Sequence, residues 1–145
     1  KIKDLGLAVK LDTNGSNPAV LKELITEGLL DYVAMDIKHS RAKYASVACS
    51  PSFNLDDIAE SVDFLKEGHV DYEFRTTLVK EMHREADMTA IGMWLMGAKA
   101  YYLQPYRDSD TVICPGYHAH SREELDTFVK ILSAFLPKVE LRGDI

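Results

Sequence analysis

The chain has 145 residues, of which 46% are hydrophobic and 28% charged, an ordinary composition for a globular domain with a substantial buried core. The net charge of −6, without any cluster of Lys and Arg, argues against nucleic acid as a partner, and no apolar run is long enough to span a membrane. Cys49 and Cys114 are too few and too far apart for a disulfide framework, so we expect a reducing cytoplasm.

The first expected strand covers residues 8–11 and ends in polar groups and a turn. Asn17 can then cap a helix that has Pro18 at its first position, where the missing N–H costs nothing. Gly28 can end this helix in the left-handed conformation. A second strand follows over residues 32–37.

The same alternation of helix and strand repeats along the rest of the chain. Asn54 can cap a helix that Gly68 ends, and Ser121 and Glu124 form a capping box for the last helix. The remaining expected elements are an additional loop at residues 38–52, a strand at 71–79, a helix at about 87–96, a strand at 101–104, a loop at 105–120 and a short strand at 139–141.

Four or five strands separated by helices predict an α/β fold with a parallel sheet and right-handed crossovers. A partial (β/α) barrel and an open doubly wound sheet both fit this pattern. The sequence begins at Lys1 without an initiator Met, so we expect it to be the later part of a longer protein. Because such sheets place their ligands at the carboxyl ends of the strands, polar residues there are the first site candidates.

Asp12 and Thr13 end the first expected strand. Their carboxylate and hydroxyl could coordinate a cation or accept hydrogen bonds from an ammonium group. The alternative is a plain turn, because Asp-Thr-Asn-Gly is a sequence that favours turns.

Asp36 and Lys38 end the second strand and, with one residue between them, point the same way. A mutual ion pair at a barrel rim is the structural interpretation. A Schiff-base or proton-transfer lysine is a second interpretation, and a lysine that binds a ligand carboxylate while Asp36 holds it in place is a third.

Arg75 lies inside the third strand, where a guanidinium must face a polar cavity or pair with a carboxylate. Glu73 points the same way, so a purely structural pair of these two residues competes with a ligand-binding role. Gln104 ends the fourth strand and could donate or accept a hydrogen bond to a ligand, although strand ends are often merely polar.

Cys114, His118 and His120 lie close together in the long loop, but their spacing matches no standard zinc site, and a solvated loop is the better interpretation. The chain contains neither of the glycine-rich motifs that bind nucleotides at a helix start.

His39 and His83 are interpreted as surface residues. Met88, Met93 and Met96 are interpreted as core packing rather than as a cofactor site.

Four segments, residues 10–15, 31–38, 71–77 and 139–143, read KLDTNG, DYVAMDIK, DYEFRTT and VELRG. Together they resemble the radical S-adenosylmethionine (SAM) activating enzymes of glycyl radical enzymes, above all those that act on anaerobic ribonucleoside-triphosphate reductases. The resemblance runs along essentially the whole chain. It implies a partial (β/α)6 barrel, of which residues 1–145, as the C-terminal part of the domain, would supply about strands three to six and the C-terminal helix.

The resemblance also implies cofactors and partners. Enzymes of this family hold a [4Fe–4S] cluster by three cysteines of one loop, and SAM binds the open iron. With an electron from a donor such as flavodoxin or ferredoxin, cleavage of SAM yields a radical that removes a hydrogen atom from a glycine of the partner enzyme. The expected partner is an anaerobic ribonucleoside-triphosphate reductase.

Six residues match positions that the family uses around SAM: Asp12, Thr13, Asp36, Lys38, Arg75 and Gln104. The resemblance assigns Asp12, Thr13 and Asp36 to a possible monovalent cation site beside the SAM carboxylate. It assigns Lys38 to that carboxylate, Arg75 to the end of the site near SAM and substrate, and Gln104 to the strand that flanks the adenosyl group.

The chain departs from the family in one large respect, because the cysteine loop is absent from this sequence. Cys49 and Cys114 cannot supply the three thiolates that such a cluster needs. We therefore expect the chain alone to bind no cluster, to have no radical activity and to hold no cofactor. We also expect an unpaired barrel edge that favours self-association.

Two other interpretations stay open. Some barrel aldolases and decarboxylases use an Asp-x-Lys at a strand end, as Asp36 and Lys38 would provide, although Arg41 stands where those enzymes often have a further Asp. The chain could instead be a non-catalytic barrel half that only docks a partner protein.

Overall fold

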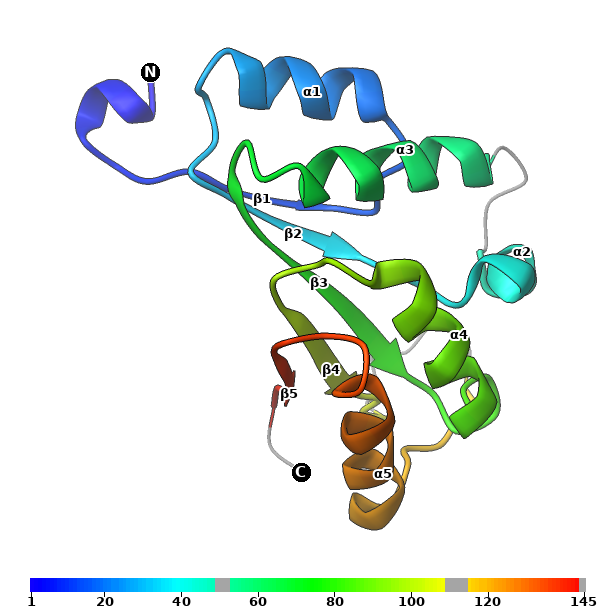
Figure 1. The fold of residues 1–145 in the computed structure, drawn as a ribbon. Coiled ribbons are helices and arrows are strands. Elements are labelled where there is room, and N and C mark those ends of the chain that lie inside the picture. The colour runs from blue at the N-terminus through cyan, green and yellow to red at the C-terminus, as the bar shows by residue number, and fades with distance from the viewer. Residues whose placement is uncertain (49–52, 109–114, 144–145) are drawn as a thin grey trace.

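The computed structural model describes residues 1–48, 53–108 and 115–143. Its centre is a sheet of five parallel strands in the order β1-β2-β3-β4-β5 (Figure 1). The strands are β1 (Lys10–Thr13), β2 (Tyr32–Asp36), β3 (Asp71–Leu78), β4 (Tyr101–Pro105) and β5 (Val139–Leu141). The predicted parallel sheet of strands that alternate with helices is confirmed.

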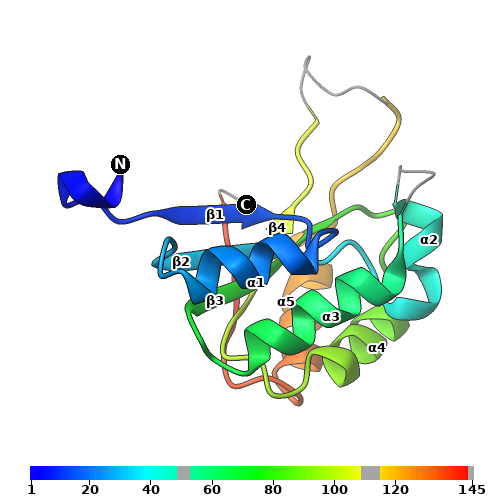
Figure 2. The same ribbon diagram turned by 90° about the horizontal axis from the view of Figure 1, so that it is seen from above.

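Helices connect the strands and cover one face of the sheet, as the two views show together (Figures 1 and 2). The α-helices are α1 (Pro18–Thr26), α2 (Tyr44–Val47), α3 (Leu55–Lys66), α4 (Glu85–Leu95) and α5 (Arg122–Leu132). Two short 3-10 helices, η1 (Lys3–Leu5) and η2 (Arg41–Lys43), complete the list, and η2 and α2 lie in the loop predicted at residues 38–52. None of the helices in the described part of the chain is long and apolar enough to cross a membrane.

The ends of several elements differ from the predicted ones by one to two residues. The first strand continues through Thr13, because Asp12 and Thr13 still pair with Ala34 and Met35 of β2. Helix α4 begins at Glu85, since the Asp87 carboxylate accepts a hydrogen bond from the Arg84 N–H and so caps the helix earlier in the chain.

The core lies between the sheet and its helices. On β3, Tyr72, Phe74 and Leu78 point toward the helices and are buried, and Met35 of β2 is fully buried beside them. The opposite face of the sheet carries no helix (Figure 2). That face is therefore where polar side chains of the strands can meet a ligand.

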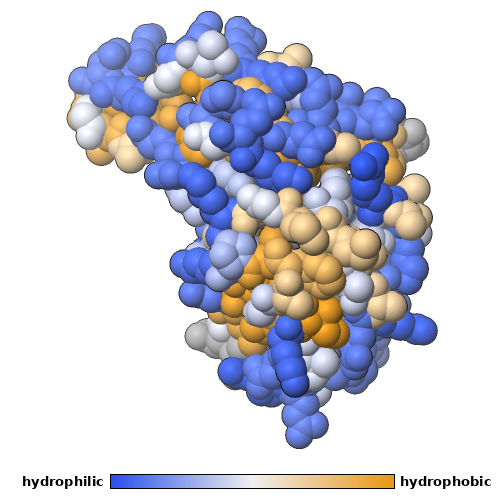
Figure 3. All heavy atoms as spheres, viewed as in Figure 1, coloured by the Kyte–Doolittle hydropathy of each residue, from blue (hydrophilic) through white to orange (hydrophobic). Residues whose placement is uncertain are grey.

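The interpretation of three methionines as core is wrong for two of them. Met88 is fully buried, but Met93 and Met96 of the α4 region are 62% and 54% exposed. Hydrophobic residues gather on the surface over α4, whereas the outer surface around α1 and α3 is mostly hydrophilic (Figure 3). Apolar residues of helix α4 lie on its exposed side as well as on its core side. Their spacing in the sequence therefore does not distinguish buried positions from exposed ones.

Strand β1 pairs with β2 alone and leaves its other edge without a hydrogen-bonded neighbour among the described residues. This agrees with the expected unpaired edge. Self-association through it stays a prediction.

Gly15, in the turn after β1, has a φ of +74°, and a Cβ placed on it would lie 2.0 Å from Cε of Met35. Gly15→Ala is expected to lower the free energy of unfolding by about 3 kcal/mol, because left-handed strain and overpacking add. Gly6→Ala is the matched control, since Gly6 has a φ of +75° but no atom within 4 Å of such a Cβ. It is expected to cost about 1 kcal/mol. Urea denaturation of both variants measures the difference, and equal losses would contradict the packing argument.

Candidate functional site

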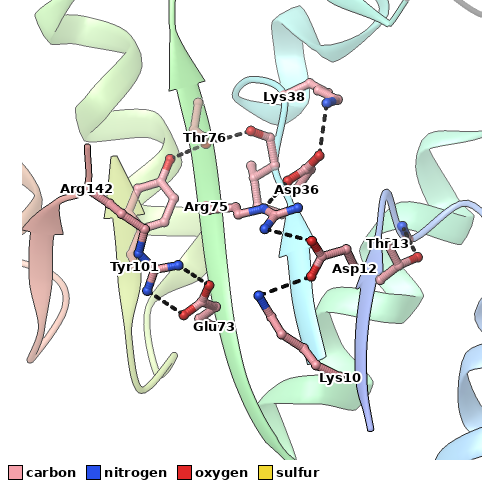
Figure 4. Close-up of polar contacts among 12 residues, drawn as sticks. Lys10, Asp12, Thr13, Asp36, Lys38, Glu73, Arg75, Thr76, Tyr101 and Arg142 are labelled. Atoms are coloured by element: carbon pink, nitrogen blue, oxygen red, sulfur yellow. Dashed lines mark hydrogen bonds and ion pairs between the residues drawn. The ribbon is translucent and has the colours of Figure 1, made fainter. Parts of the chain in front are cut away.

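Three charged side chains from adjacent strands meet on the face of the sheet that lacks helices (Figure 4). Asp12 of β1, Asp36 of β2 and Arg75 of β3 point to this face, because side chains alternate along a strand and the neighbours of Asp12 and Arg75 point to the core. Asp36 and Arg75 are direct partners in the sheet register. Of the site residues predicted from the sequence, the structure thus brings Asp12, Asp36 and Arg75 together.

Arg75 lies between the two carboxylates and contacts both. Its Nε is 2.5 Å from Oδ1 of Asp36, and its Nη1 is 3.2 Å from Oδ2 of Asp12. Lys38 Nζ lies 3.2 Å from the other oxygen of Asp36, and Lys10 Nζ lies 3.2 Å from the other oxygen of Asp12. Glu73, the competing partner for Arg75, does not pair with it.

The array of Lys10, Asp12, Asp36, Lys38 and Arg75 has three positive and two negative charges, hence a net charge of +1. Burial raises the pKa of Asp12, but the hydrogen bond from Lys10 and the charge of Arg75 outweigh it and hold that pKa below its usual range. Both carboxylates are already neutralised, so the surplus charge favours an incoming anion.

Lys38 is the member of this array that is best placed to reach a ligand. It follows the end of β2, and its side chain is 49% exposed, compared with 16% for that of Arg75. Arg75 is held by two carboxylates, whereas Lys38 has one carboxylate partner, Asp36, which it shares with Arg75. Gln104 lies near the carboxyl end of β4, in register with Thr77 on the same face.

Thr13 points to the opposite face from Asp12, and its hydroxyl oxygen accepts a hydrogen bond of 3.0 Å from the Gly15 N–H. Asn14 closes a similar turn by accepting from the Ser16 N–H. The turn interpretation of this segment is therefore present in the structure. No group of three or more His, Cys, Asp or Glu that could hold a metal ion occurs among the described residues.

A second polar cluster on the same face was missed by the sequence reasoning. The Arg142 guanidinium donates two hydrogen bonds, of 2.5 and 2.8 Å, to the buried carboxylate of Glu73. The Tyr32 hydroxyl donates a third, at 2.9 Å, and Arg142 stacks 3.7 Å above the ring of Tyr102. The feature of the sequence that indicates this cluster is Glu73 itself, because a carboxylate inside a strand needs a cationic partner.

The interpretation of His39 and His83 as surface residues is wrong. They are 1% and 2% exposed, because their rings bond to backbone groups of the loops at the carboxyl end of the sheet. His120 is also buried, whereas His118 is exposed and pairs with Glu81. Cys114 and Cys49 lie outside the described residues, so the weak metal hypothesis for Cys114, His118 and His120 is not tested.

No family model matches this chain. Over 111 residues it is 35% identical to a protein of Methanocaldococcus jannaschii that is provisionally named a glycyl-radical enzyme activating enzyme. It is homologous to part of that protein. The match covers 74% of this chain and 46% of the archaeal protein.

A solved structure confirms the fold class. A domain of the pyruvate-formate lyase-activating enzyme from Bacteroides vulgatus superposes with a TM-score of 0.74 over 97% of this chain and 84% of the domain. The sequence identity is 15%, so this likeness speaks for the α/β partial barrel alone.

The residues of this chain fit one of the two cofactors expected of radical SAM activating enzymes, SAM, better than the other, the [4Fe–4S] cluster. The described residues include no cysteine, and the sequence has two in all, fewer than the three thiolates that such a cluster needs. The positive array on the open face of the sheet, with the exposed Lys38 just after the end of β2, does fit the carboxylate of an amino-acid ligand such as SAM.

Proposed function

We propose that this chain forms the part of a radical SAM activating enzyme that binds the amino-acid end of SAM, and that the whole protein generates a glycyl radical on a partner enzyme. The observation that carries the proposal is the array around Arg75 on the open face of β1 to β3. The homology to an activating enzyme supports the reaction class.

Each member of the array has a part in holding the ligand. Lys38 donates to the ligand carboxylate, and Asp36 restrains the lysine from the side through its Oδ2. Arg75 fixes Asp36 and Asp12 across three strands, so the carboxylates do not turn toward the ligand and repel it. SAM and the cluster, when bound, supply the radical that removes a hydrogen atom from the glycine.

The array also bears on the monovalent cation proposed for Asp12, Thr13 and Asp36. In the structure, Lys10, Arg75 and Lys38 occupy the positions beside the two aspartates. A cation would therefore have to compete with Arg75 for the aspartates.

The cysteines that bind the cluster would come from outside this sequence, in keeping with a match that covers 46% of the archaeal protein. The chain alone is then inactive. The proposed partner is an anaerobic ribonucleoside-triphosphate reductase in the cytoplasm, and the electron donor is flavodoxin or ferredoxin. The resemblance of the four segments to that group of activating proteins supports this choice.

The aldolase or decarboxylase alternative lacks structural support. A Schiff-base lysine needs a desolvated pocket, but Lys38 is half-exposed and paired with Asp36. Nothing in the described residues favours a purely docking role over ligand binding at the positive array.

The test is an assay of the full-length protein, reconstituted with iron and sulfide without oxygen and supplied with a reductant and SAM. We expect 5'-deoxyadenosine by chromatography and a glycyl radical signal in the electron paramagnetic resonance spectrum of the added reductase. A reconstituted protein that holds a cluster but releases no 5'-deoxyadenosine contradicts the proposal. Turnover of SAM without a radical on the reductase overturns the choice of partner alone.

A further inference from the structure

Two buried imidazoles stack beside the candidate site. His39, in the loop after β2, and His83, after β3, have ring centroids 4.8 Å apart and planes 13° from parallel. They are 1% and 2% exposed. The stack joins the two loops at the carboxyl end of the sheet, next to Lys38.

The hydrogen bonds of His83 define its protonation state. Its Nε2 lies 3.0 Å from the carbonyl oxygen of Lys38, which can only accept, so Nε2 carries the proton. Its Nδ1 lies 3.1 Å from the Val79 N–H, which can only donate, so Nδ1 is unprotonated there. The carbonyl of Val79, at 3.3 Å, is a poorer partner for that nitrogen. His83 is thus a neutral ring with both nitrogens satisfied.

His39 has the same pattern. Its Nε2 lies 2.9 Å from the carbonyl oxygen of Met82, and its Nδ1 accepts from the Ser40 N–H at 2.8 Å. Nδ1 of His39 also lies 3.1 Å from the Ser40 hydroxyl, which can donate or accept. A second proton on each ring would place two charges 4.8 Å apart in a buried space.

Charged groups surround the stack unevenly. Asp87 Oδ2 is 3.8 Å from Nε2 of His39, but Lys43 already pairs with this carboxylate at 2.6 Å. The other charged or titratable residues around the cavity that His83 lines are Lys80, Arg84, Glu85, His120 and Glu124. Burial lowers the pKa of His83 below its ordinary 6.5 and outweighs the hydrogen bond to the Lys38 carbonyl, which acts in the opposite direction.

The backbone of Lys38 depends on side chains, because the β2 strand has ended at Asp36. Its N–H donates to the Tyr44 hydroxyl at 3.1 Å, and its carbonyl accepts from His83. The preceding carbonyl, of Ile37, accepts from the Thr76 hydroxyl at 2.5 Å (Figure 4). The lysine side chain itself is half-exposed and pairs with Asp36, so its position depends on this backbone together with that ion pair.

We propose that His83, braced by the stacked ring of His39, is a positioning residue that fixes the backbone of Lys38 so that its ammonium meets the ligand carboxylate. The inference rests on the proposed function for the role of Lys38. Neither the fold nor the homology requires the buried histidine pair to have this role in ligand binding. The positioning role depends on one hydrogen bond, from His83 Nε2 to the carbonyl of Lys38.

Two substitutions separate this hydrogen bond from general loss of packing. His83→Gln can keep a donor near the position of Nε2, whereas His83→Asn can keep an acceptor near Nδ1 but does not reach the carbonyl of Lys38. Both remove the ring stack, so we expect similar losses of stability. In the full-length protein we expect the dissociation constant of SAM to rise about five-fold more for His83→Asn than for His83→Gln. Equal SAM affinity of the two variants overturns the proposal.

A second readout on the full-length protein does not depend on SAM. Long-range proton–nitrogen spectra are expected to show the Nε2–H tautomer for the ring of His83 at pH 7. Hydrogen exchange of the Lys38 amide is expected to accelerate in His83→Asn more than in His83→Gln. The other tautomer, or equal exchange, overturns the positioning role. If these results hold while the full-length protein cleaves no SAM, the proposed function fails and the positioning of Lys38 stands.

The pH profile of stability gives an independent check. The unfolded chain takes up a proton on residue 83 near pH 6.5, while the folded protein excludes it to lower pH because the pKa is lowered. The free energy of unfolding therefore falls as the pH falls below 6.5, and it levels off below the folded pKa. This part of the profile is expected to be absent from His83→Gln. A wild-type stability that rises on acidification through this window contradicts the neutral ring.

Discussion

Replacing Lys38 by alanine is expected to weaken SAM binding by the full-length protein about 10- to 100-fold, because a hydrogen bond to a charged group contributes about 1.5–3 kcal/mol. Stability changes little, since the pair with Asp36 is exposed. The release of 5'-deoxyadenosine at limiting SAM falls by the same factor. Equilibrium binding of SAM and chromatography of the product measure the two effects.

Lys22→Ala is the matched control for this experiment. Lys22 pairs with Glu60 between α1 and α3, on the helical side of the sheet, and its exposed fraction of 39% is comparable. Its loss removes one positive charge without touching the open face, so SAM affinity stays at the wild-type value. If Lys38→Ala and Lys22→Ala bind SAM equally well, the positive array does not hold the ligand carboxylate.

The sequence was sufficient to predict the part of the site that depends on local rules. Alternation along a strand puts Asp12 and Arg75 on the face opposite the core, and parallel strands bring their carboxyl ends to one edge. These two rules place Asp12 and Asp36 near one another, and they put Arg75 on the same face of the sheet without fixing its partner. They do not say that Arg75 bridges the two aspartates, because that depends on the register between β2 and β3.

The partners of Glu73 and His83 could not be predicted in this way. Glu73 has Arg75 two residues away on the same face, yet it pairs with Arg142, 69 positions later. The choice depends on how the sheet brings β5 near β3, which no local pattern records. His83 is buried because it satisfies a carbonyl 45 positions earlier, and a lone histidine in a loop carries no sign of that need.

Replacing Arg142 by methionine is expected to destabilise the protein by about 3 kcal/mol or more, since it leaves the carboxylate of Glu73 buried without its cation. Glu73 would retain the Tyr32 hydroxyl as a partner. Chemical denaturation at pH 7 measures the loss. Arg122→Met is the control, because Arg122 pairs with Asp126 on the exposed surface of α5 and such pairs contribute about 0.5 kcal/mol or less.

The pH dependence of these variants distinguishes a lost ion pair from lost packing. Burial raises the pKa of Glu73, but the hydrogen bonds from Arg142 and Tyr32 outweigh it and keep that pKa below its ordinary 4.5. In the wild type, the contribution of Glu73 to the free energy of unfolding is fully present above pH 4.5. It is lost as the pH falls through the pKa that Glu73 has in the folded protein. In Arg142→Met, burial dominates and the folded pKa rises, so acidification from pH 7 recovers stability relative to the wild type.

The double variant Glu73→Gln/Arg142→Met completes this argument. Because it removes the buried charge together with its cation, it is expected to recover about half or more of the stability lost in Arg142→Met. If the double variant is as unstable as the two single losses added, Arg142 acts through its stacking on Tyr102 rather than through the carboxylate. In that case the Glu73–Arg142 ion pair does not hold the segment after β5 against β3. The shape of the open face then depends on packing between β4 and β5.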